Sequence, residues 1–550
     1  MKHLLIISGA LIVFLTAYTT IRSPKQGFSK EAYDRAMAKK ALGTISCTPD
    51  WRTYYLSAEQ VQDMVPLPGT GTHTWKISTK SDSAQFYFNQ GINLYYGFHI
   101  AEAMPSFKKA QLFDSSCAML YWAEALAYGP NINDLGYFAS PDALLAAQKA
   151  EDLSKPASKK ERALINAMWH RYSADTTVSR EILNEHYASL MQDVFDEYPK
   201  DPEIGALYAD ALMVQHPWDL WQHNGRPQPW EPRIQTTLEK VLRYDPDHPG
   251  ANHYYIHTME ASPFAYKALP SADRLARLAP GLSHMVHMPS HIYIRTGNYE
   301  KGEAVNAAAV AAYHKYLTIF PAAVNGAPLY EIHNLHMRAA CSMNGNDYTV
   351  ALRDANACRQ SIDPSYMGLD APMGDFVQYV YMEPMLTMVT FKKWDEILSN
   401  AALPDSLHYA SAIQQFAYGM ADAGKDMLQP AKAALAKMDI ELAQNDMAVI
   451  FPPFNSPKAA GAVARDILAG TIAEKENDMS TALILFRRAV TEEDALVYNE
   501  PRDWLIPARH YLGNALLDAG NKKEAAAVFK EDLRVQPNNE IAKEGLKKSN

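Results

Sequence analysis

Histidine is concentrated in the middle of the chain, in patterns that suit metal binding. The sequence has 550 residues and 18 histidines, and eight of the histidines fall within residues 253–336. Seven of these eight form three short groups: His253 and His257; His284, His287 and His291; and His333 and His336. Spacings of three and four residues place side chains on one face of a helix, so each group is expected to direct its imidazoles to one side.

A carboxylate extends the first group, because Glu260 lies three residues after His257 and shares its helix face. Uncharged imidazole is a good ligand for transition metals, whereas clustered histidines without a metal repel one another when protonated. Eight ligands exceed the needs of one tetrahedral ion, so one or two ions are expected. The expected ligand sets are His284, His287 and His291 for one ion, and His253, His257, His333 and His336 for the other. Glu260 would be a further ligand or the catalytic general base.

The predicted centre does not match a common motif-defined enzyme. The sequence contains no HExxH string or its inverse, no GxSxG elbow and no Walker loop. A metal centre of this kind suits hydrolysis by a metal-bound hydroxide, or oxidation if the metal is copper or iron. Methionines nearby favour copper slightly, although methionine at helical spacing is more often core filler. They are Met259, Met285, Met288 and Met337. Copper or zinc is therefore expected, with iron as a third choice; the alternative is a hydrogen-bonded polar groove without metal.

Aromatic residues near the histidines are candidates for binding a substrate. The candidates are Tyr254, Tyr293, Tyr330, Trp218 and Trp221. The two tryptophans belong to residues 216–232, where several prolines exclude a regular helix. This segment is either a connection that packs its aromatic rings on the helices or a lid over the site. His216, Asp219 and His223 within it are candidates for additional or supporting ligands.

The elements that position these residues are predicted to be helices. From Ser83 onward, Ala, Leu, Tyr and Met recur at three- and four-residue spacing, and strand signals are almost absent. Three stretches share one spacing of small and bulky residues: Gly91, Ala103, Phe107 and Ala110; Gly470, Ala482, Phe486 and Ala489; and Leu512, Gly513, Gly520, Ala525, Phe529 and Pro537. This spacing resembles the tetratricopeptide repeat, a pair of antiparallel helices. The resemblance implies an all-α solenoid in which each pair buries its apolar face on the next.

The same resemblance implies a place for the histidines. Aligning Gly297 with the turn of a repeat puts the three histidine groups and Glu260 on successive first helices, on the side that lines the concave groove where this family holds ligands. The strings at 248–257, 284–295 and 332–336 are also similar to those of a group of exported bacterial tetratricopeptide proteins. This second resemblance supports the fold and the unity of the histidine cluster, and implies no particular reaction.

The sequence predicts six regions. They are a signal peptide or N-terminal anchor (1–22), an irregular extension (23–82), N-terminal helical repeats (83–204), histidine-rich central repeats with the Pro/Trp-rich loop (205–345), degenerate repeats (346–460) and C-terminal repeats (461–550). The first has a basic start and about 15 apolar residues, which is typical of a secretory signal and short for a membrane span. We therefore expect export to a periplasmic or other extracytoplasmic location, with an N-terminal membrane tether if the signal is not cleaved.

Composition narrows the partners and the chemistry further. Hydrophobic residues make up 48% of the chain, enough for a large core, and 52 basic against 62 acidic residues give a formal charge of -10. With no basic run, we expect no nucleic-acid partner. Four cysteines without a CxxC pair exclude a zinc ribbon and a disulfide-framed fold. Cys341 and Cys358 either form a disulfide across one helix pair or remain buried thiols.

Two classes of function follow. The first is a metal-dependent oxidoreductase or hydrolase that acts on a small molecule or peptide in the groove. The second is a non-catalytic scaffold that binds a peptide or partner protein, or delivers metal. Histidine-rich grooves are unusual for scaffolds, so the sequence favours the metal centre.

Overall fold

The computed structural model describes residues 49, 51, 54–134, 137–319, 327–403, 406–451 and 454–550. The predicted signal at 1–22 and Cys47 lie outside these ranges. Within them the regular structure is helical, and β-structure is limited to one isolated bridge between Trp221 and Pro227. The predicted all-α fold is confirmed.

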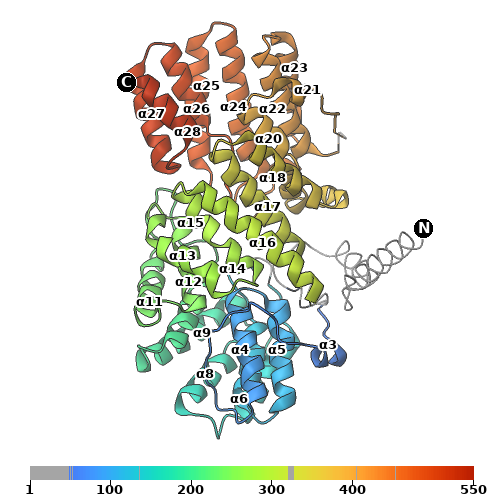
Figure 1. Cartoon of the computed structure of the whole chain (residues 1–550), viewed down its shortest axis with the longest axis vertical. Coiled ribbons are helices and arrows are strands. Elements are labelled where there is room, and N and C mark those ends of the chain that lie inside the picture. The colour runs from blue at the N-terminus through green and yellow to red at the C-terminus, as the bar shows by residue number, and fades with distance from the viewer. Residues whose placement is uncertain are drawn as a thin grey trace, which may run out of the picture.

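The helices follow one another along the long axis of the molecule, from α4 and α5 at one end to α24–α28 at the other (Figure 1). The N-terminal helices are α3 (Ala58–Gln62), α4 (Asp82–Tyr96), α5 (Ile100–Phe113), α6 (Ala118–Ala127), α7 (Pro141–Asp152), α8 (Lys159–Trp169), α9 (Arg180–Glu197) and α10 (Pro202–Met213). The central helices are α11 (Glu231–Tyr244), α12 (Pro249–Glu260), η1 (Ala265–Ala268), α13 (Leu269–Leu278), α14 (Ser283–His287), α15 (Pro289–Arg295), α16 (Tyr299–Ile319) and α17 (Ala327–Asn344).

The remaining helices form the other end of the molecule (Figure 1). They are α18 (Tyr348–Ser361), η3 (Pro364–Gly368), α19 (Met373–Tyr381), α20 (Glu383–Thr390), α21 (Trp394–Leu398), α22 (His408–Gly424), α23 (Leu428–Leu442), η4 (Asp446–Ala448), α24 (Pro457–Lys475), α25 (Met479–Ala495), α26 (Ala508–Asp518), α27 (Lys522–Val535) and α28 (Glu540–Ser549). Among the described residues, no helix is both long and apolar enough to cross a bilayer.

Side-chain caps mark where many helices begin. Ser81, Ser158 and Asp201 each accept a hydrogen bond from a backbone N–H in the first turn of α4, α8 and α10. Such caps satisfy donors that would otherwise lack a partner at a helix start. Pro141 and Pro202 occupy the first turn of α7 and α10, where a missing N–H is tolerated.

The three predicted repeats pack as their spacing requires. A Cβ atom added to Gly91 would lie 2.4 Å from the ring of Phe107, and the same holds for Gly470 with Phe486 at 2.5 Å and for Gly513 with Phe529 at 2.4 Å. Each glycine therefore leaves the space that the phenylalanine of the paired helix fills. All three phenylalanines are fully buried. The pairs α4–α5, α24–α25 and α26–α27 are tetratricopeptide-type helix hairpins.

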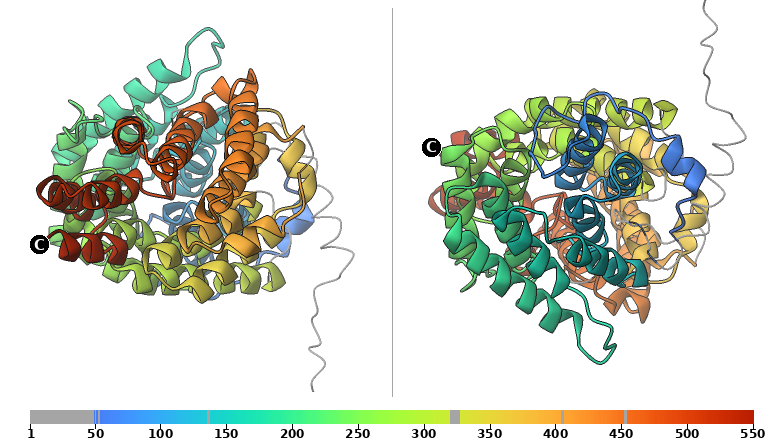
Figure 2. Two further views of the ribbon diagram at one scale, coloured as in Figure 1. Left: turned by 90° about the horizontal axis from the view of Figure 1, so that it is seen from above. Right: turned by 90° about the horizontal axis from the view of Figure 1, so that it is seen from below.

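The solenoid curves so strongly that distant repeats touch. Gly297, with φ +71°, lies at the turn before α16, and a Cβ atom there would lie 2.1 Å from the carbonyl oxygen of Pro537. The Tyr299 hydroxyl donates to that oxygen at 2.8 Å. At the other end, the Tyr330 hydroxyl of α17 donates to the carbonyl of Phe98, between α4 and α5, at 3.1 Å. Viewed along the long axis, the helices are arranged around a common centre (Figure 2).

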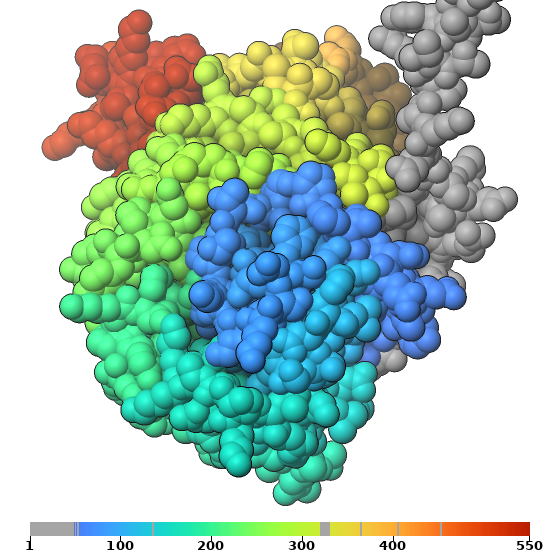
Figure 3. Space-filling view, turned by 60° about the horizontal axis from the view of Figure 1, so that its bottom comes forward, coloured from blue at the N-terminus to red at the C-terminus, as the bar shows by residue number. Residues whose placement is uncertain are grey.

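The N-terminal residues complete this arrangement at one end. Figure 3 shows them, in blue, lying against the cyan and green helices. The Leu67 N–H donates to Gln90 at 2.8 Å, and the Gly281 N–H donates to the Gly69 carbonyl at 2.8 Å. The segment before α4 therefore joins α4 to the central repeats, next to the histidine-rich helices.

The two cysteines of the predicted hairpin are free buried thiols. Cys341 packs its sulfur against Gly302, and Cys358 donates to the carbonyl of Ile332 at 3.6 Å. Burial raises the pKa of both thiols. Of the two alternatives for this pair, the structure has the unpaired one.

Candidate metal centre

Four of the central helices carry the histidines. His253, His257 and Glu260 lie on α12, and His333 and His336 lie on α17. The group between them is divided, because the chain breaks at Met288 into α14 and α15. Pro289 causes this break, since it has no N–H to continue the helical ladder. His284 and His287 therefore belong to α14, whereas His291 belongs to α15.

The first histidine group consists of His253, His257 and His284, all of which are at most 5% exposed. The Nε2 atom of His253 lies 3.1 Å from Nε2 of His257 and 3.1 Å from Nε2 of His284. Two imidazoles bound to one tetrahedral zinc ion have their nitrogens about 3.3 Å apart, given a Zn–N bond of about 2.0–2.1 Å. Two of the three pairs of nitrogens therefore have nearly the separation that one shared ion requires, and all three ligand atoms lie within 4.8 Å of one another.

Hydrogen bonds at the opposite ring nitrogens fix two of these three rings. His253 Nδ1 lies 2.6 Å from the carbonyl oxygen of Tyr96, which can only accept, so Nδ1 carries the hydrogen. His257 Nδ1 lies 2.8 Å from the Glu260 carboxylate and carries its hydrogen for the same reason. Both Nε2 atoms consequently present lone pairs, 3.1 Å apart, to the same point. A carbonyl or carboxylate behind a histidine ring is the usual support of a metal ligand.

The second histidine group consists of His287, His291 and His333. Nε2 of His287 lies 2.7 Å from Nε2 of His291, and the rings of His287 and His333 are 4.6 Å apart at their centroids. Nδ1 of His287 donates to the Asn306 side-chain oxygen at 2.5 Å. His333 is the most open member, with 19% of its side chain exposed. The described residues therefore contain two adjacent groups of three imidazoles.

Glu260 lies between the two groups. One of its oxygens accepts from His257 Nδ1, and the other lies 2.7 Å from His291 Nδ1. Glu500, from the irregular segment before α26, is 2.8 Å from the same nitrogen of His291. At His257 and His291 the carboxylates thus stand at Nδ1, whereas Glu500 also lies 3.9 Å from Nε2 of His333. His257, Glu260 and Glu500 also offer ligand atoms within 4.8 Å of one another, so the ligand and general-base roles of Glu260 stay predictions.

Burial and mutual proximity set the protonation of the six rings. Burial, with neighbouring imidazoles, holds the pKa of His253, His284 and His287 well below its ordinary value. Burial also lowers the pKa of His257 and of His333 to about 3. Five rings are therefore neutral at pH 7, the form that binds metals.

His291 and Glu500 behave differently. Burial alone would lower the pKa of His291, but the charges of Glu500 and Glu260 outweigh it and raise the pKa to about 10. Burial, followed by the charge of Glu260, raises the pKa of Glu500 to about 7. A protonated His291 can donate from Nε2 to His287, so the second group can also be satisfied by hydrogen bonds alone.

The grouping differs from the sequence prediction. We expected His284, His287 and His291 to share one ion, but His284 lies in the first group, whereas His287 and His291 lie with His333. His284 and His287 are neighbours on α14 that face different helices, since His284 contacts His253 of α12 and His287 contacts Asn306 of α16. His336 joins neither group. Its Nδ1 lies 3.1 Å from the buried carboxylate of Glu383 on α20. His336 lies one turn of α17 after His333, and this position places the His336 side chain between α17 and α20.

A third set of possible ligands lies outside the cluster and has a different character. His73, His248 and Glu203 come within 4.8 Å of one another. Glu203 accepts from Tyr96 at 2.6 Å and from His73 at 2.5 Å. His248 caps α12: its Nδ1 accepts from the Ala251 N–H at 3.0 Å. Because Nδ1 accepts, Nε2 of the neutral ring must carry the hydrogen and has no lone pair for a metal.

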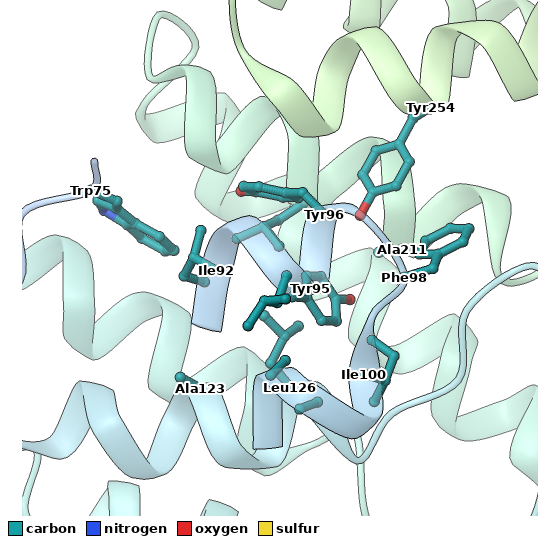
Figure 4. Packing of buried hydrophobic residues seen from close by; sticks show 14 of the residues in the cluster. Trp75, Ile92, Tyr95, Tyr96, Phe98, Ile100, Ala123, Leu126, Ala211 and Tyr254 are labelled. Atoms are coloured by element: carbon teal, nitrogen blue, oxygen red, sulfur yellow. The ribbon is translucent and has the colours of Figure 1, made fainter. Parts of the chain in front are cut away.

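Aromatic side chains cover the first group. The ring of Phe98 lies 4.5 Å from that of His253 and 5.6 Å from that of His284, and Tyr330 lies 5.3 Å from His284. The ring of Tyr254 stacks on that of His253 at 5.6 Å, from the side of the apolar core. Figure 4 shows Tyr254 directed into the apolar cluster beside Tyr96 and Phe98. Tyr293 donates to Asp273 at 2.7 Å, away from the histidines. Of the predicted tyrosines, Tyr254 and Tyr330 are therefore in ring contact with a histidine of the first group, and Tyr293 is not.

The Pro/Trp-rich loop reaches the site as well as packing on the helices. Trp221 Nε1 donates to the Thr258 carbonyl of α12 at 2.6 Å, and His216 stacks on Trp230 at 3.7 Å. Trp218, with φ +61°, stands edge-on to His257 at 5.6 Å. A positive φ is uncommon for a bulky residue and often accompanies function. The segment therefore packs its aromatic rings on the helices, as one interpretation predicted, and its role as a lid stays a prediction.

Trp218 separates two cavities. One is a cleft of about 990 Å³ between the central and C-terminal repeats, lined by Trp218, Asp219, Trp221, His223, Arg295 and Tyr498 among others. The second is a small cavity of about 20 Å³ that touches His257, Glu260 and His216. The cleft has the size of a small-molecule site, and a ligand in it is one side chain away from the first group.

Sequence reasoning missed several supports of the site. Glu500 lies between helices, more than two hundred residues from Glu260, and no local signal marks it. Tyr96 contributes a backbone carbonyl, which side-chain types do not reveal. Asn306 could have been found, because it shares the buried stripe of α16 with Tyr299, Gly302 and Ala309. A polar residue on an apolar stripe indicates a buried hydrogen bond.

The chain was also compared with known proteins. No family model matches the sequence, and no curated protein matches it. Among solved structures it is similar to the human IFIT1 dimer with PPP-AAAA (12% identity, 93% of this chain and 98% of that chain, TM-score 0.31) and to yeast Tom70 (11%, 85% and 88%, TM-score 0.27). It is likewise similar to the TPR domain of P58(IPK) (11%, 85% and 97%, TM-score 0.21).

Scores of this size carry no argument about ligands or partners. The class of the protein rests instead on its own helix hairpins: it is an all-α solenoid of the tetratricopeptide type. That architecture is one of scaffolds and binding proteins. The expectation that no nucleic acid binds remains a prediction from charge.

Proposed function

We propose that this protein is a metalloprotein that holds two transition-metal ions on two adjacent groups of three histidines and uses them in catalysis. The observation that carries the proposal is the convergence of the Nε2 lone pairs of His253 and His257, 3.1 Å apart in a buried site. A single hydrogen on His284 Nε2 can point at only one of them. A metal ion satisfies all three nitrogens together.

The ligand type supports zinc or copper, with iron as a third choice. Three neutral imidazoles suit these metals and leave a fourth position for water or substrate. Such an ion lowers the pKa of bound water or activates oxygen, depending on the metal. Met259, Met285 and Met288 belong to the hydrophobic core, so they give copper no extra support.

The surrounding residues are suited to holding such a centre for a reaction. Tyr96, Glu260 and Asn306 fix three of the six rings from the Nδ1 side. Phe98 packs against the first group. The large cleft beyond Trp218 provides room for a small molecule or the end of a peptide. We therefore favour an oxidoreductase or a hydrolase over a protein that only stores metal.

A scaffold without metal is the second candidate, and the second histidine group favours it. His291, protonated and paired with Glu260 and Glu500, can donate to His287 and leave that group satisfied without an ion. The tetratricopeptide-type fold is compatible with binding a peptide or partner protein.

Metal reconstitution separates the candidates. We would chelate the full chain, dialyse it against Zn²⁺ or Cu²⁺, and then titrate the copper form with azide while recording its visible and electron paramagnetic resonance spectra. An enzyme is expected to bind two ions and to show azide binding at an open position. Ions that bind but do not respond to azide would indicate storage or delivery. Folded protein that takes up no stoichiometric metal would leave the scaffold.

Export is a separate part of the proposal. It is supported by the basic and apolar pattern of residues 1–22, which predicts a secretory signal. N-terminal sequencing of the protein from fractionated cells tests it: an extracytoplasmic chain is expected, and an intact chain confined to the cytoplasm would contradict it.

A further inference from the structure

The large cleft contains a cation without a carboxylate partner. Arg295 ends α15, one turn after His291, and lines the cleft. Its guanidinium donates to the carbonyls of Glu260 and Ser262, each at 3.1 Å. Among the described residues, no carboxylate lies within ion-pair distance of it. Its charge is therefore held in place by neutral groups and remains uncompensated.

The other arginines of the cleft provide an internal comparison. Arg509 makes two hydrogen bonds to Asp494, at 2.8 and 2.6 Å, and Arg534 is bonded to both oxygens of Glu531. Both are neutralised within the protein. Arg502 is intermediate, since its nearest carboxylate oxygen, on Glu493, is 3.6 Å away and the other oxygen of Glu493 accepts from the Ala508 N–H. Free positive charge is thus concentrated at Arg295 and Arg502.

Aromatic rings surround this charge. Arg295 lies over the ring of Tyr498 at 5.5 Å, and Trp218 and Trp221 line the same cleft. Burial, followed by the charge of Arg502, lowers the pKa of Arg295 to about 10, which agrees with the proximity of a second cation in the cleft. An arginine fork of this kind binds carboxylates and phosphates in preference to neutral groups.

We propose that the cleft binds a small aromatic oxyanion, a carboxylate or a phosphate ester, whose charged group pairs with Arg295 and Arg502 while its uncharged part extends past Trp218 toward the first histidine group. This inference rests on the proposed function, since it names the substrate class of the same centre. His291 and Arg295 are four residues apart on α15, so the anchor lies about one helical turn from a metal ligand. That separation suits a molecule the size of an acylated amino acid or an aryl phosphate.

Calorimetric titration of the full chain tests the inference with three probes: benzoylglycine, phenyl phosphate and the neutral benzoylglycinamide. At least one of the two anions is expected to bind, and the amide is expected not to. Loss of one charged contact should weaken anion binding about 10- to 100-fold in Arg295→Gln. The same direction is expected in Arg502→Gln, which leaves the carbonyls of Glu260 and Ser262 bonded to Arg295. Arg534→Gln, from an already neutralised pair in the same cleft, is the matched control and should bind as the wild type does.

Each result has one meaning. Arginine-dependent binding of benzoylglycine or phenyl phosphate supports the inference and identifies which oxyanion fits. Binding of neither anion at millimolar concentration overturns it, as does binding that Arg295→Gln and Arg502→Gln leave unchanged or that Arg534→Gln weakens equally. Running the titrations on chelated as well as metal-loaded protein keeps the two proposals separate. If the anion binds to a chain that takes up no metal, the result supports the proposed cleft site and contradicts the metal centre. If the chain takes up metal but binds no anion, the result supports the metal centre and contradicts the cleft site.

Discussion

Two clusters of histidine and carboxylate lie close together in this protein. They differ in which imidazole nitrogen carries the hydrogen and which one keeps its lone pair. In the first histidine group, His253 and His257 donate from Nδ1 to Tyr96 and Glu260, so their Nε2 lone pairs converge. In the set around Glu203, His248 accepts at Nδ1 from the Ala251 N–H, so its Nε2 carries the hydrogen. The same residue types at similar distances therefore give a candidate metal site in one place and a helix cap with a hydrogen-bonded carboxylate in the other.

Chelation is expected to give the largest difference between the two clusters. A ligand present at about 100 times its Kd stabilises the folded state by about 2.7 kcal/mol, so two ions should add about 5 kcal/mol. Chemical denaturation with and without chelator measures this. On chelation, the free energy of unfolding of Glu203→Gln should fall by the same amount as that of the wild type. For His257→Leu, which lacks a ligand of one ion, the decrease should be about half as large. Equal losses in the two variants would contradict the distinction.

Glu260→Gln is expected to weaken both ions together. The glutamine keeps the size of the side chain but removes the charge that supports His257 and His291. Loss of such a support typically lowers metal affinity about 10- to 100-fold. Competition with a chelator of known affinity measures the change. An unchanged affinity for both ions would show that Glu260 does not orient the rings, and Glu203→Gln again serves as the matched control.

Acid should destabilise the metal-free cluster. His257 and His333 have folded-state pKa values of about 3, against an ordinary value of 6.5, so the unfolded chain binds more protons between those limits. The free energy of unfolding should therefore fall as the pH decreases from 6.5, by about 1.4 kcal/mol per pH unit for each such histidine. The pKa of Glu500 is raised from 4.5 to about 7 in the folded state, so this one group acts in the opposite direction and increases the free energy of unfolding as the pH falls from 7 to 4.5.

His73 should show the opposite sign. Burial would lower its pKa, but the hydrogen bond and charge of Glu203 raise it, so its stabilisation is present below pH 6.5 and is lost as the pH rises through the folded value. Denaturation of the chelated protein across this range tests both signs. His257→Leu should flatten the acid slope and His73→Ala should not; the reverse pattern would contradict the assigned protonation states.

The smallest expected effect is that of His73→Ala on the metal. Removing this ring takes one hydrogen bond from Glu203, which still accepts from Tyr96, and should cost about 1–3 kcal/mol of stability. The metal content should not change. Loss of an ion in His73→Ala would show that the set around Glu203 belongs to the metal centre after all.

Much of the fold could be predicted from the sequence because its signals are local. The spacing of Gly91 and Phe107, for example, is a packing rule within one hairpin, and the structure confirms it. The concentration of histidines on α12, α14, α15 and α17 was likewise visible. Their division into two groups was not visible, because it depends on which neighbouring helix each of His284 and His287 faces and on how far α17 lies from each helix. Glu500 reaches the site only through the curvature of the whole solenoid.

Elemental analysis of untagged protein, purified without added metal, tests the central claim most directly. It should be run beside two triple variants, His253→Ala/His257→Ala/His284→Ala and His287→Ala/His291→Ala/His333→Ala, with far-ultraviolet circular dichroism to verify folding. The wild type should contain two equivalents of a transition metal, and each folded triple variant should retain one. Metal-free wild type that is folded and takes up no added zinc or copper would contradict the account. So would a metal content that both triple variants leave unchanged.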